Sequence, residues 1–170
     1  TYEEIRVNKP WAITGKGPRS ERNVIKSLRL QPDVLEAHIH RLFEKYDRME
    51  KELVRYETYG EPDPEIVFVA FGTVARLVAE TMDILAERGY KAGMIRPVTL
   101  WPFPFDAFAR ISDKTRLVVS VELSMGQLLT DVKAAVCGRV PVGLINRTGG
   151  VVPTPVEIAD RAIKQLKALD

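Results

Sequence analysis

Short apolar runs alternate with amphipathic segments from residue 61 to residue 170, and this alternation limits the fold more than any other feature of the sequence. The first run, residues 66–71, is apolar at every position, as in strands that a parallel sheet buries on both faces. Similar runs predict strands at residues 94–95, 117–121 and 142–145, each followed by a helical pattern. Right-handed connections between such units build an α/β fold: a three-layer, mostly parallel open sheet of about five strands.

The predicted helices of this part have recognisable ends. Thr73 follows the first strand and is expected to cap the helix that begins there. The last helix carries a capping box, Thr154 with Glu157, and has Pro155 at its first position. These signals support the order of strands and helices that the apolar runs predict.

The chain divides into three parts by composition: residues 1–31, 32–60 and 61–170. Residues 1–31 are polar, carry seven basic and three acidic residues, and show no clean period, so they predict an extended connector strap. A nucleic-acid-binding arm is the alternative, but the aromatic side chains that single-strand binding interleaves with basic ones are missing.

Residues 32–60 predict a long amphipathic helix followed by a linker. Apolar side chains recur at alternating spacings of four and three residues from Leu35 to Tyr56, which is the spacing of a coiled-coil seam. The seam suits a two-stranded coiled coil or a helix packed on its own protein. The second interpretation is favoured, because tyrosine at two seam positions fits a broad surface better. We therefore expect one helix over residues 33–57 with its seam buried against protein.

Residue counts exclude several classes of site. With one cysteine, the chain has no intramolecular disulfide, no cysteine-rich zinc site and no self-contained iron–sulfur cluster. His38 and His40 are two apart on a helix and face different directions, so they cannot chelate one metal ion. A net charge of +2 gives no argument for nucleic acid or membrane as a partner. The longest apolar run, residues 66–71, is too short to span a membrane, so a cytoplasmic location is expected. Because the sequence begins at Thr1 and not at Met, it is either a processed chain or a piece of a longer one, and both possibilities stay open.

Catalytic signatures are also missing from the sequence. Residues 14–20 resemble a phosphate loop only superficially, because neither Ser nor Thr follows Lys16 directly and no strand precedes the segment. Residues 71–76 hold one of the three glycines of a dinucleotide fingerprint. Cys137 falls late in a predicted helix and is expected to be a small buried hydrophobe. We assign no catalytic, cofactor-binding or metal-binding residue.

The loops after the strands form the candidate site, because open parallel sheets bind ligands or partners at the carboxyl ends of their strands. Glu122 follows an apolar strand, where a carboxylate costs free energy unless it is paired. It is either a structural carboxylate that caps the next helix or pairs with Arg96 or Arg147, or a carboxylate at the crevice mouth that faces a partner or ligand. We expect its side chain at the crevice mouth. The candidate interface or crevice residues are Gly72, Thr73, Arg96, Glu122, Ser124, Gly126, Gln127 and Arg147.

Several motifs resemble one enzyme family. Residues 91–104, which include Leu-Trp-Pro-Phe-Pro, look like the second strand and following loop of the transketolase C-terminal-type domain in 2-oxoacid:ferredoxin oxidoreductases. Residues 121–128 are similar to the Glu…Gly-Gln motif of that family, and residues 146–150 resemble its Gly-Gly loop. Residues 2–5 and 9–12 look like the connector before this domain in the alpha-type subunit of the 2-oxoisovalerate and 2-oxoglutarate members.

The resemblance implies a thiamine-diphosphate enzyme that oxidatively decarboxylates a 2-oxoacid, with coenzyme A as acyl acceptor and ferredoxin as electron acceptor. The style of the connector favours 2-oxoisovalerate as the substrate. The chain would be a C-terminal domain that serves subunit assembly and is inactive alone. Its partners would be the other domain of the same subunit and the other subunits. Thiamine diphosphate, magnesium and iron–sulfur clusters are expected in the complete enzyme, and no cofactor is expected in this chain.

Two alternatives to this function stay open. One is a non-catalytic α/β module that binds other proteins through its loops. The other is the C-terminal domain of another thiamine enzyme, of the transketolase or E1 type, although residues 101–104 weigh against it.

Overall fold

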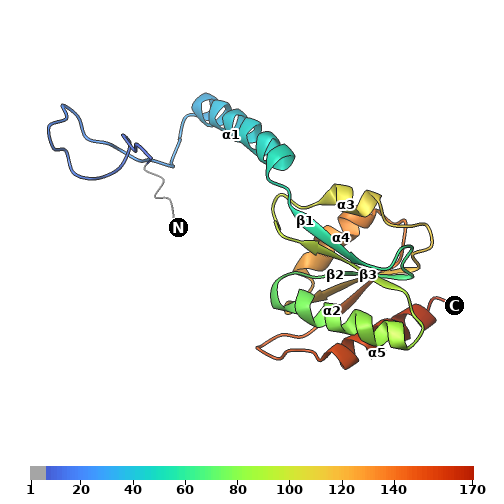
Figure 1. Ribbon diagram of the computed structural model, residues 1–170. Helices are drawn as coiled ribbons and strands as arrows, with labels where there is room; N and C mark the ends of the chain where they lie inside the picture. The colour runs from blue at the N-terminus through green and yellow to red at the C-terminus, as the bar shows by residue number, and fades with distance from the viewer. Residues whose placement is uncertain (1–6) are drawn as a thin grey trace. The chain divides into compact units, whose positions relative to one another are not determined.

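The computed structural model of the chain describes residues 7–170, so the connector motif at residues 2–5 lies outside the described residues. Two compact units divide the chain, Thr1–Tyr46 and Asp47–Asp170. In the first unit, residues 7–31 form neither helix nor strand. The second unit holds the sheet and the helices that cover it (Figure 1), so it is the part that positions a site.

Helix α1 (Pro32–Glu52) is shorter than the predicted helix, and none of its residues is buried. It begins at Pro32, as expected, because proline lacks the N–H group that the first turn would leave unbonded. Along the seam, Leu35 and Ile39 are exposed and Leu42 is half-buried. No residue of the seam is buried within the single chain that the structure describes, so burial of the seam against another protein surface stays a prediction.

The end of the predicted helix is in fact strand β1 (Tyr56–Gly60), which pairs antiparallel with β3 (Ala92–Pro97). The chain enters this strand at Arg55, whose backbone N–H and carbonyl both form hydrogen bonds with Thr99. The Arg55 N–H donates to the Thr99 hydroxyl at 3.0 Å, and the Thr99 N–H donates to the Arg55 carbonyl at 3.1 Å. The prediction of helix up to residue 57 was wrong because these partners are more than forty residues away and leave no local signal.

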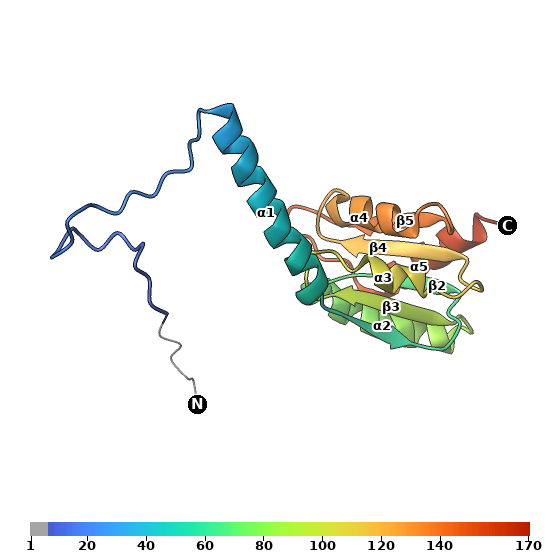
Figure 2. The ribbon, with the colours of Figure 1, turned by 90° about the horizontal axis from the view of Figure 1, so that it is seen from above.

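Five strands form one sheet in the order β1-β3-β2-β4-β5. Strands β2 (Ile66–Val69), β4 (Leu117–Glu122) and β5 (Val142–Asn146) run parallel to β3, whereas β1 runs antiparallel. Figure 2 shows the arrows of β3 and β4 pointing one way and the arrow of β1 pointing the other way. The predicted class, a mostly parallel open sheet of about five strands, is confirmed.

Helices cover both faces of the sheet. They are α2 (Gly72–Glu87) and α5 (Pro155–Lys167) on one face, and α3 (Phe105–Ala109) and α4 (Gln127–Val136) on the other. Side chains alternate along a strand, so Phe68 joins the first core and its neighbour Val69 joins the second. Both side chains are fully buried, which explains why β2 is apolar at every position.

The helix ends bear out one capping prediction and correct another. The Thr154 hydroxyl accepts the backbone N–H of Glu157 at 3.1 Å and caps α5, as predicted. Thr73 does not cap α2, because the helix begins one residue earlier, at Gly72, and Phe71 occupies the cap position without a side-chain hydrogen bond.

Of the helices between residues 7 and 170, none combines the length and the apolar character needed to cross a membrane.

Candidate functional site

The carboxyl edge of the parallel strands carries exposed apolar side chains in each of its four loops. Their exposed fractions range from 37% to 74%. Exposure of such side chains to water is unfavourable, and the free energy falls when another surface covers them. We call this set the apolar rim; its members are Phe71, Val98, Leu100, Trp101, Leu123, Met125, Val151 and Val152.

The opposite edge of the sheet has a different character. Its loops span residues 61–65, 88–91, 110–116 and 137–141. As far as the structure describes the chain, none of these four loops exposes a large apolar side chain. Charged residues dominate them, including Glu61, Asp63, Lys91, Lys114 and Arg116. The two edges therefore differ in a way that makes the carboxyl edge the better candidate for a contact surface.

Glu122 lies at the end of β4 and is buried, with 2% of its surface exposed. Its carboxylate accepts four hydrogen bonds. The hydroxyls of Ser120 (3.1 Å) and Ser124 donate two of them, and the backbone N–H groups of Leu128 (3.2 Å) and Leu129 (3.1 Å) donate the others. The two N–H groups belong to the first turn of α4, where no carbonyl of the helix can accept them. The carboxylate thus caps α4 from inside the protein.

The expected position of the Glu122 side chain at the crevice mouth was therefore wrong. The structural interpretation, a carboxylate that caps the next helix, is the one that its hydrogen bonds support. It does not pair with Arg96 or Arg147, because those arginines bind Glu57 and Glu157 instead.

The Glu122 cap fixes the loop that follows β4. The Asn146 side-chain amide donates to the Ser124 carbonyl at 2.8 Å and ties the loop to β5. Gly126 has a φ of 102°, a backbone conformation that side chains with a Cβ rarely adopt, and the chain turns there into α4. With the polar groups of the loop bonded inward, Leu123 and Met125 remain on the surface of the apolar rim.

Arg96 and Arg147 occupy the carboxyl edge as ion pairs within the chain. Arg96 binds Glu57 of β1 at 2.7 Å. The pKa of the Glu57 carboxyl lies below its ordinary value, because the Tyr59 hydroxyl donates to it and Arg96 lies beside it. Arg147 binds Glu157 of α5 at 2.8 Å, and the edge therefore presents little unpaired charge next to the rim.

Glu157 also receives a second arginine, Arg161, at 3.4 Å. The hydrogen bond from Arg147 is the largest cause of a lowered Glu157 pKa, and Arg161 adds to it. This pair of contacts anchors the loop after β5, where Gly149 and Gly150 both have positive φ. The Glu157 carboxylate is consequently engaged in ion pairs that hold this loop.

The remaining predicted residues lie in the same loops but do not converge on one point. Gly72, Thr73 and Gln127 are exposed at the starts of α2 and α4, and Ser124 is half-buried through its bond to Glu122. Cys137 is exposed at the end of α4, so the expectation of a buried hydrophobe was wrong. Whether any of these residues contacts a partner stays a prediction.

Sequence reasoning missed the apolar rim, although its signal was present. Val98, Leu100, Met125 and Val151 each stand in a loop that directly follows a predicted strand. Loops are usually polar, so apolar residues recurring after several strands are a signal of a covered edge.

Metal binding has no support in the geometry of this site. Within the described stretch, residues 7–170, no three His, Cys, Asp or Glu side chains form a group that could hold a metal ion. The carboxylates of Glu122 and Glu157 are already engaged by donors of the chain itself.

Comparison with known proteins gives one family. Residues 64–158 match the family described as pyruvate:ferredoxin oxidoreductase core domain II. The chain is 38% identical over 147 residues to ketoisovalerate oxidoreductase subunit VorB of Methanothermobacter thermautotrophicus, an alignment that covers 86% of this chain and 41% of that subunit. It is 40% identical over 99 residues to 2-oxoglutarate synthase subunit KorA of Archaeoglobus fulgidus, covering 58% of this chain and 27% of that one.

A solved structure agrees in fold. The 2-oxoglutarate:ferredoxin oxidoreductase from Magnetococcus marinus matches with a TM-score of 0.66 and 22% identity, over 81% of this chain and 24% of that one. The chain spans about two fifths of the length of the VorB subunits that it matches.

Proposed function

Because the chain belongs to the pyruvate:ferredoxin oxidoreductase core domain II family, we propose that it is the C-terminal domain of the alpha-type subunit of a 2-oxoacid:ferredoxin oxidoreductase. The complete enzyme would convert a 2-oxoacid, coenzyme A and two oxidised ferredoxins into acyl-CoA, CO₂, two reduced ferredoxins and a proton. The carbon–carbon bond to the carboxylate breaks, the acyl group moves to sulfur, and its two electrons leave one at a time to ferredoxin.

Within that enzyme, the role proposed for this chain is assembly. The apolar rim is the single observation that supports it, because four loops at one edge expose large apolar side chains while the opposite edge exposes charge. Large apolar side chains exposed together at one edge of a domain mark a contact with protein more often than a site for a polar ligand. The other domain of the same subunit and the other subunits are the proposed partners.

We expect no thiamine diphosphate site in this chain. A diphosphate with magnesium needs free carboxylate or carbonyl oxygen ligands, and the carboxylates of Glu57, Glu122 and Glu157 are bonded within the chain. The cofactor, magnesium and iron–sulfur clusters are therefore proposed for other parts of the complete enzyme. We expect calorimetric titration of this chain with magnesium and thiamine diphosphate to show no saturable binding tighter than millimolar.

The proposed substrate is 2-oxoisovalerate. Its support is the 38% identity to a subunit named for ketoisovalerate over most of the chain, together with the connector motif at residues 9–12. Relatives named for 2-oxoglutarate and pyruvate match over smaller shares of the chain. Turnover of the complete enzyme with the three 2-oxoacids would rank them.

The assembly role can be tested with a charge placed on the apolar rim. Met125→Asp and Leu100→Asp change side chains that are 74% and 46% exposed, so the melting temperature of this chain should stay nearly unchanged. In the complete enzyme, each variant should lose co-purification with the remaining subunits or lose turnover. Leu169→Asp is the matched control for Leu100→Asp, because Leu169 is 43% exposed and lies just beyond the C-terminal end of α5, away from the rim. Normal assembly and turnover of both rim variants would refute the assembly role.

A further inference from the structure

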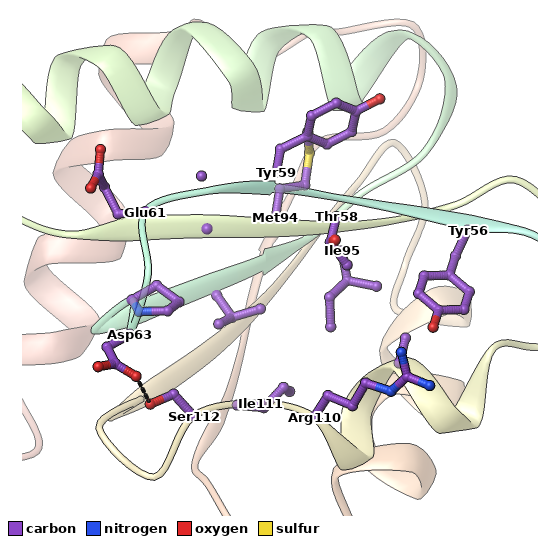
Figure 3. Close-up of a pocket in the computed structure, with 15 residues that line it drawn as sticks. Tyr56, Thr58, Tyr59, Glu61, Asp63, Met94, Ile95, Arg110, Ile111 and Ser112 are labelled. Atoms are coloured by element: carbon purple, nitrogen blue, oxygen red, sulfur yellow. Dashed lines mark hydrogen bonds between the residues drawn. The ribbon is translucent and has the colours of Figure 1, made fainter.

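A hollow of about 490 Å³ lies under strands β1 and β3, on the face of the sheet that α3 and α4 cover. Helix α3 has only five residues, while β1 extends the sheet by one strand beyond β3. The short helix leaves the outer strand without a covering element, and the space is bounded by residues 110–112 on the far side (Figure 3). The volume falls within the range of small-molecule sites.

The floor of the hollow is apolar and rigid. Ile95 comes from β3, which pairs with β1, and Val67 from β2, the next strand; each is 4% exposed. Ala107 and Ile111 continue this surface from α3 and the segment after it. A ligand that rests here would bury apolar surface against side chains that the core already fixes.

One end of the hollow is closed by polar contacts within the chain. The Ser112 hydroxyl donates to the Asp63 carboxylate at 2.8 Å, and the Lys114 ammonium lies 2.7 Å from the same carboxylate. The hydrogen bond from Lys114 is the largest cause of the lowered Asp63 pKa, so this carboxylate keeps its charge and its partners. Figure 3 shows Glu61 on the other side of the strand ribbons from Arg110.

The other end of the hollow offers donors without acceptors. Arg110 lines it with an exposed guanidinium that has no hydrogen bond or ion pair with any of residues 7–170. Tyr56 and Thr58 of β1 line the same space, and their hydroxyls likewise have no partner in that range. Figure 3 shows Tyr56 and Arg110 at the same end of the hollow. An unpaired guanidinium beside two hydroxyls and an apolar floor is a combination that recognises an anion with an apolar body.

We propose that this hollow binds a small organic carboxylate whose apolar body rests on Val67, Ile95 and Ile111 and whose carboxylate accepts from Arg110. The guanidinium can bind both carboxylate oxygens at once, and the hydroxyls of Tyr56 and Thr58 can add further donors. None of these contact residues belongs to the apolar rim, and binding is measured on this chain alone, so the proposal can fail or succeed independently of the assembly role.

The test compares a carboxylate with its neutral isostere. We expect 4-methylpentanoate, titrated into the isotopically labelled chain, to shift the amide resonances of residues 56–58 and 110–112, and 4-methylpentanamide to bind at least about tenfold more weakly. Arg110→Gln should weaken the binding of 4-methylpentanoate by about tenfold or more, since it removes a charged donor. Arg76→Gln is the control: Arg76 is also exposed and forms no ion pair with residues 7–170, but it lies on α2, on the other face of the sheet, and its loss should change nothing.

A second variant fills the space instead of removing the charge. Thr58→Trp places a large side chain in the hollow from the exposed strand, and it should abolish the shifts while the thermal melting of the chain stays intact. The proposal is overturned if the carboxylate causes no saturable shifts, if the amide binds equally well, or if Arg110→Gln and Arg76→Gln behave alike.

Discussion

Glu122 shows how one residue decides the shape of a loop. Burying a carboxylate costs free energy unless donors surround it, and this one receives two hydroxyls and two N–H groups. The donors come from both sides of the loop, so the carboxylate joins β4 to the first turn of α4. A side chain that lies inside the protein thereby determines which residues of the loop lie outside.

Replacing this carboxylate should destabilise the chain. Glu122→Ala leaves the N–H groups of Leu128 and Leu129 buried without an acceptor, and it should lower the free energy of unfolding by about 3 kcal/mol. Urea denaturation at neutral pH measures the change. Glu87→Ala, at the exposed end of α2, is the control and should change the same quantity by less than about 0.5 kcal/mol. Equal stability of the Glu122→Ala chain would show that the cap contributes nothing.

The place of the candidate residues could be predicted from the sequence, but their roles could not. A strand followed by a glycine-containing loop puts Glu122 and Gly126 at the carboxyl edge whatever their partners are. The role of Glu122 depends on which N–H groups the α4 turn presents, and a hydrogen bond across six residues leaves no pattern in the sequence. The alternative that Glu122 pairs with Arg96 could not be decided for the same reason, because the partner of Arg96, Glu57, is thirty-nine residues away.

Glu157 makes a pH-dependent contribution to stability. Its pKa in the folded chain lies below the ordinary value of 4.5, so the folded state binds this proton less readily than the unfolded state. The contribution is fully present above the ordinary value and disappears as the pH falls through the folded value. The difference in unfolding free energy between the natural chain and Glu157→Gln should therefore be largest near about pH 7 and shrink towards about pH 3.

The matched control for this experiment is Glu80→Gln. Glu80 is exposed on α2 and forms no ion pair with the described residues, so its substitution should give the same small difference at both pH values. A Glu157 difference that stays constant with pH would contradict the ion-pair explanation.

At the scale of elements, the sequence predicts buried strands well and the outer strand poorly. Strands β2 and β4 are apolar because both of their faces are covered, and that makes them visible in the sequence. Strand β1 is mostly exposed and polar, so its residues continue the helical pattern of α1 as well as they form a strand. Pairing with β3 decides between the two, and pairing is a long-range effect.

Helix α1 should be separable from the stability of the sheet. None of its residues is buried, so Leu42→Asp should change the free energy of unfolding of the unit Asp47–Asp170 by less than about 0.5 kcal/mol. Thermal and urea unfolding followed by near-ultraviolet circular dichroism measure this. Leu85→Asp, in the core between α2 and the sheet, is the comparison and should abolish cooperative unfolding. A loss of several kcal/mol with Leu42→Asp would show that the seam packs on the sheet unit.

At the scale of the whole molecule, the sheet separates two kinds of surface. The apolar rim gathers at the carboxyl edge, and charged loops occupy the amino edge. The separation follows from topology, because parallel strands bring all of their outgoing loops to one side. A single edge can thus meet protein while the other stays in water.

Strand β1 has a consequence for anyone who shortens the chain. A version that begins at residue 61, where composition alone places the domain, would lack β1 and leave the outer backbone of β3 unpaired. Bare strand edges with buried, apolar neighbours recruit strands from other molecules, so this version should aggregate. Light scattering at matched concentration should show particles growing for residues 61–170 and a monodisperse solution for residues 47–170. The five residues of β1 cover the edge of β3 and should thereby protect the chain from self-association.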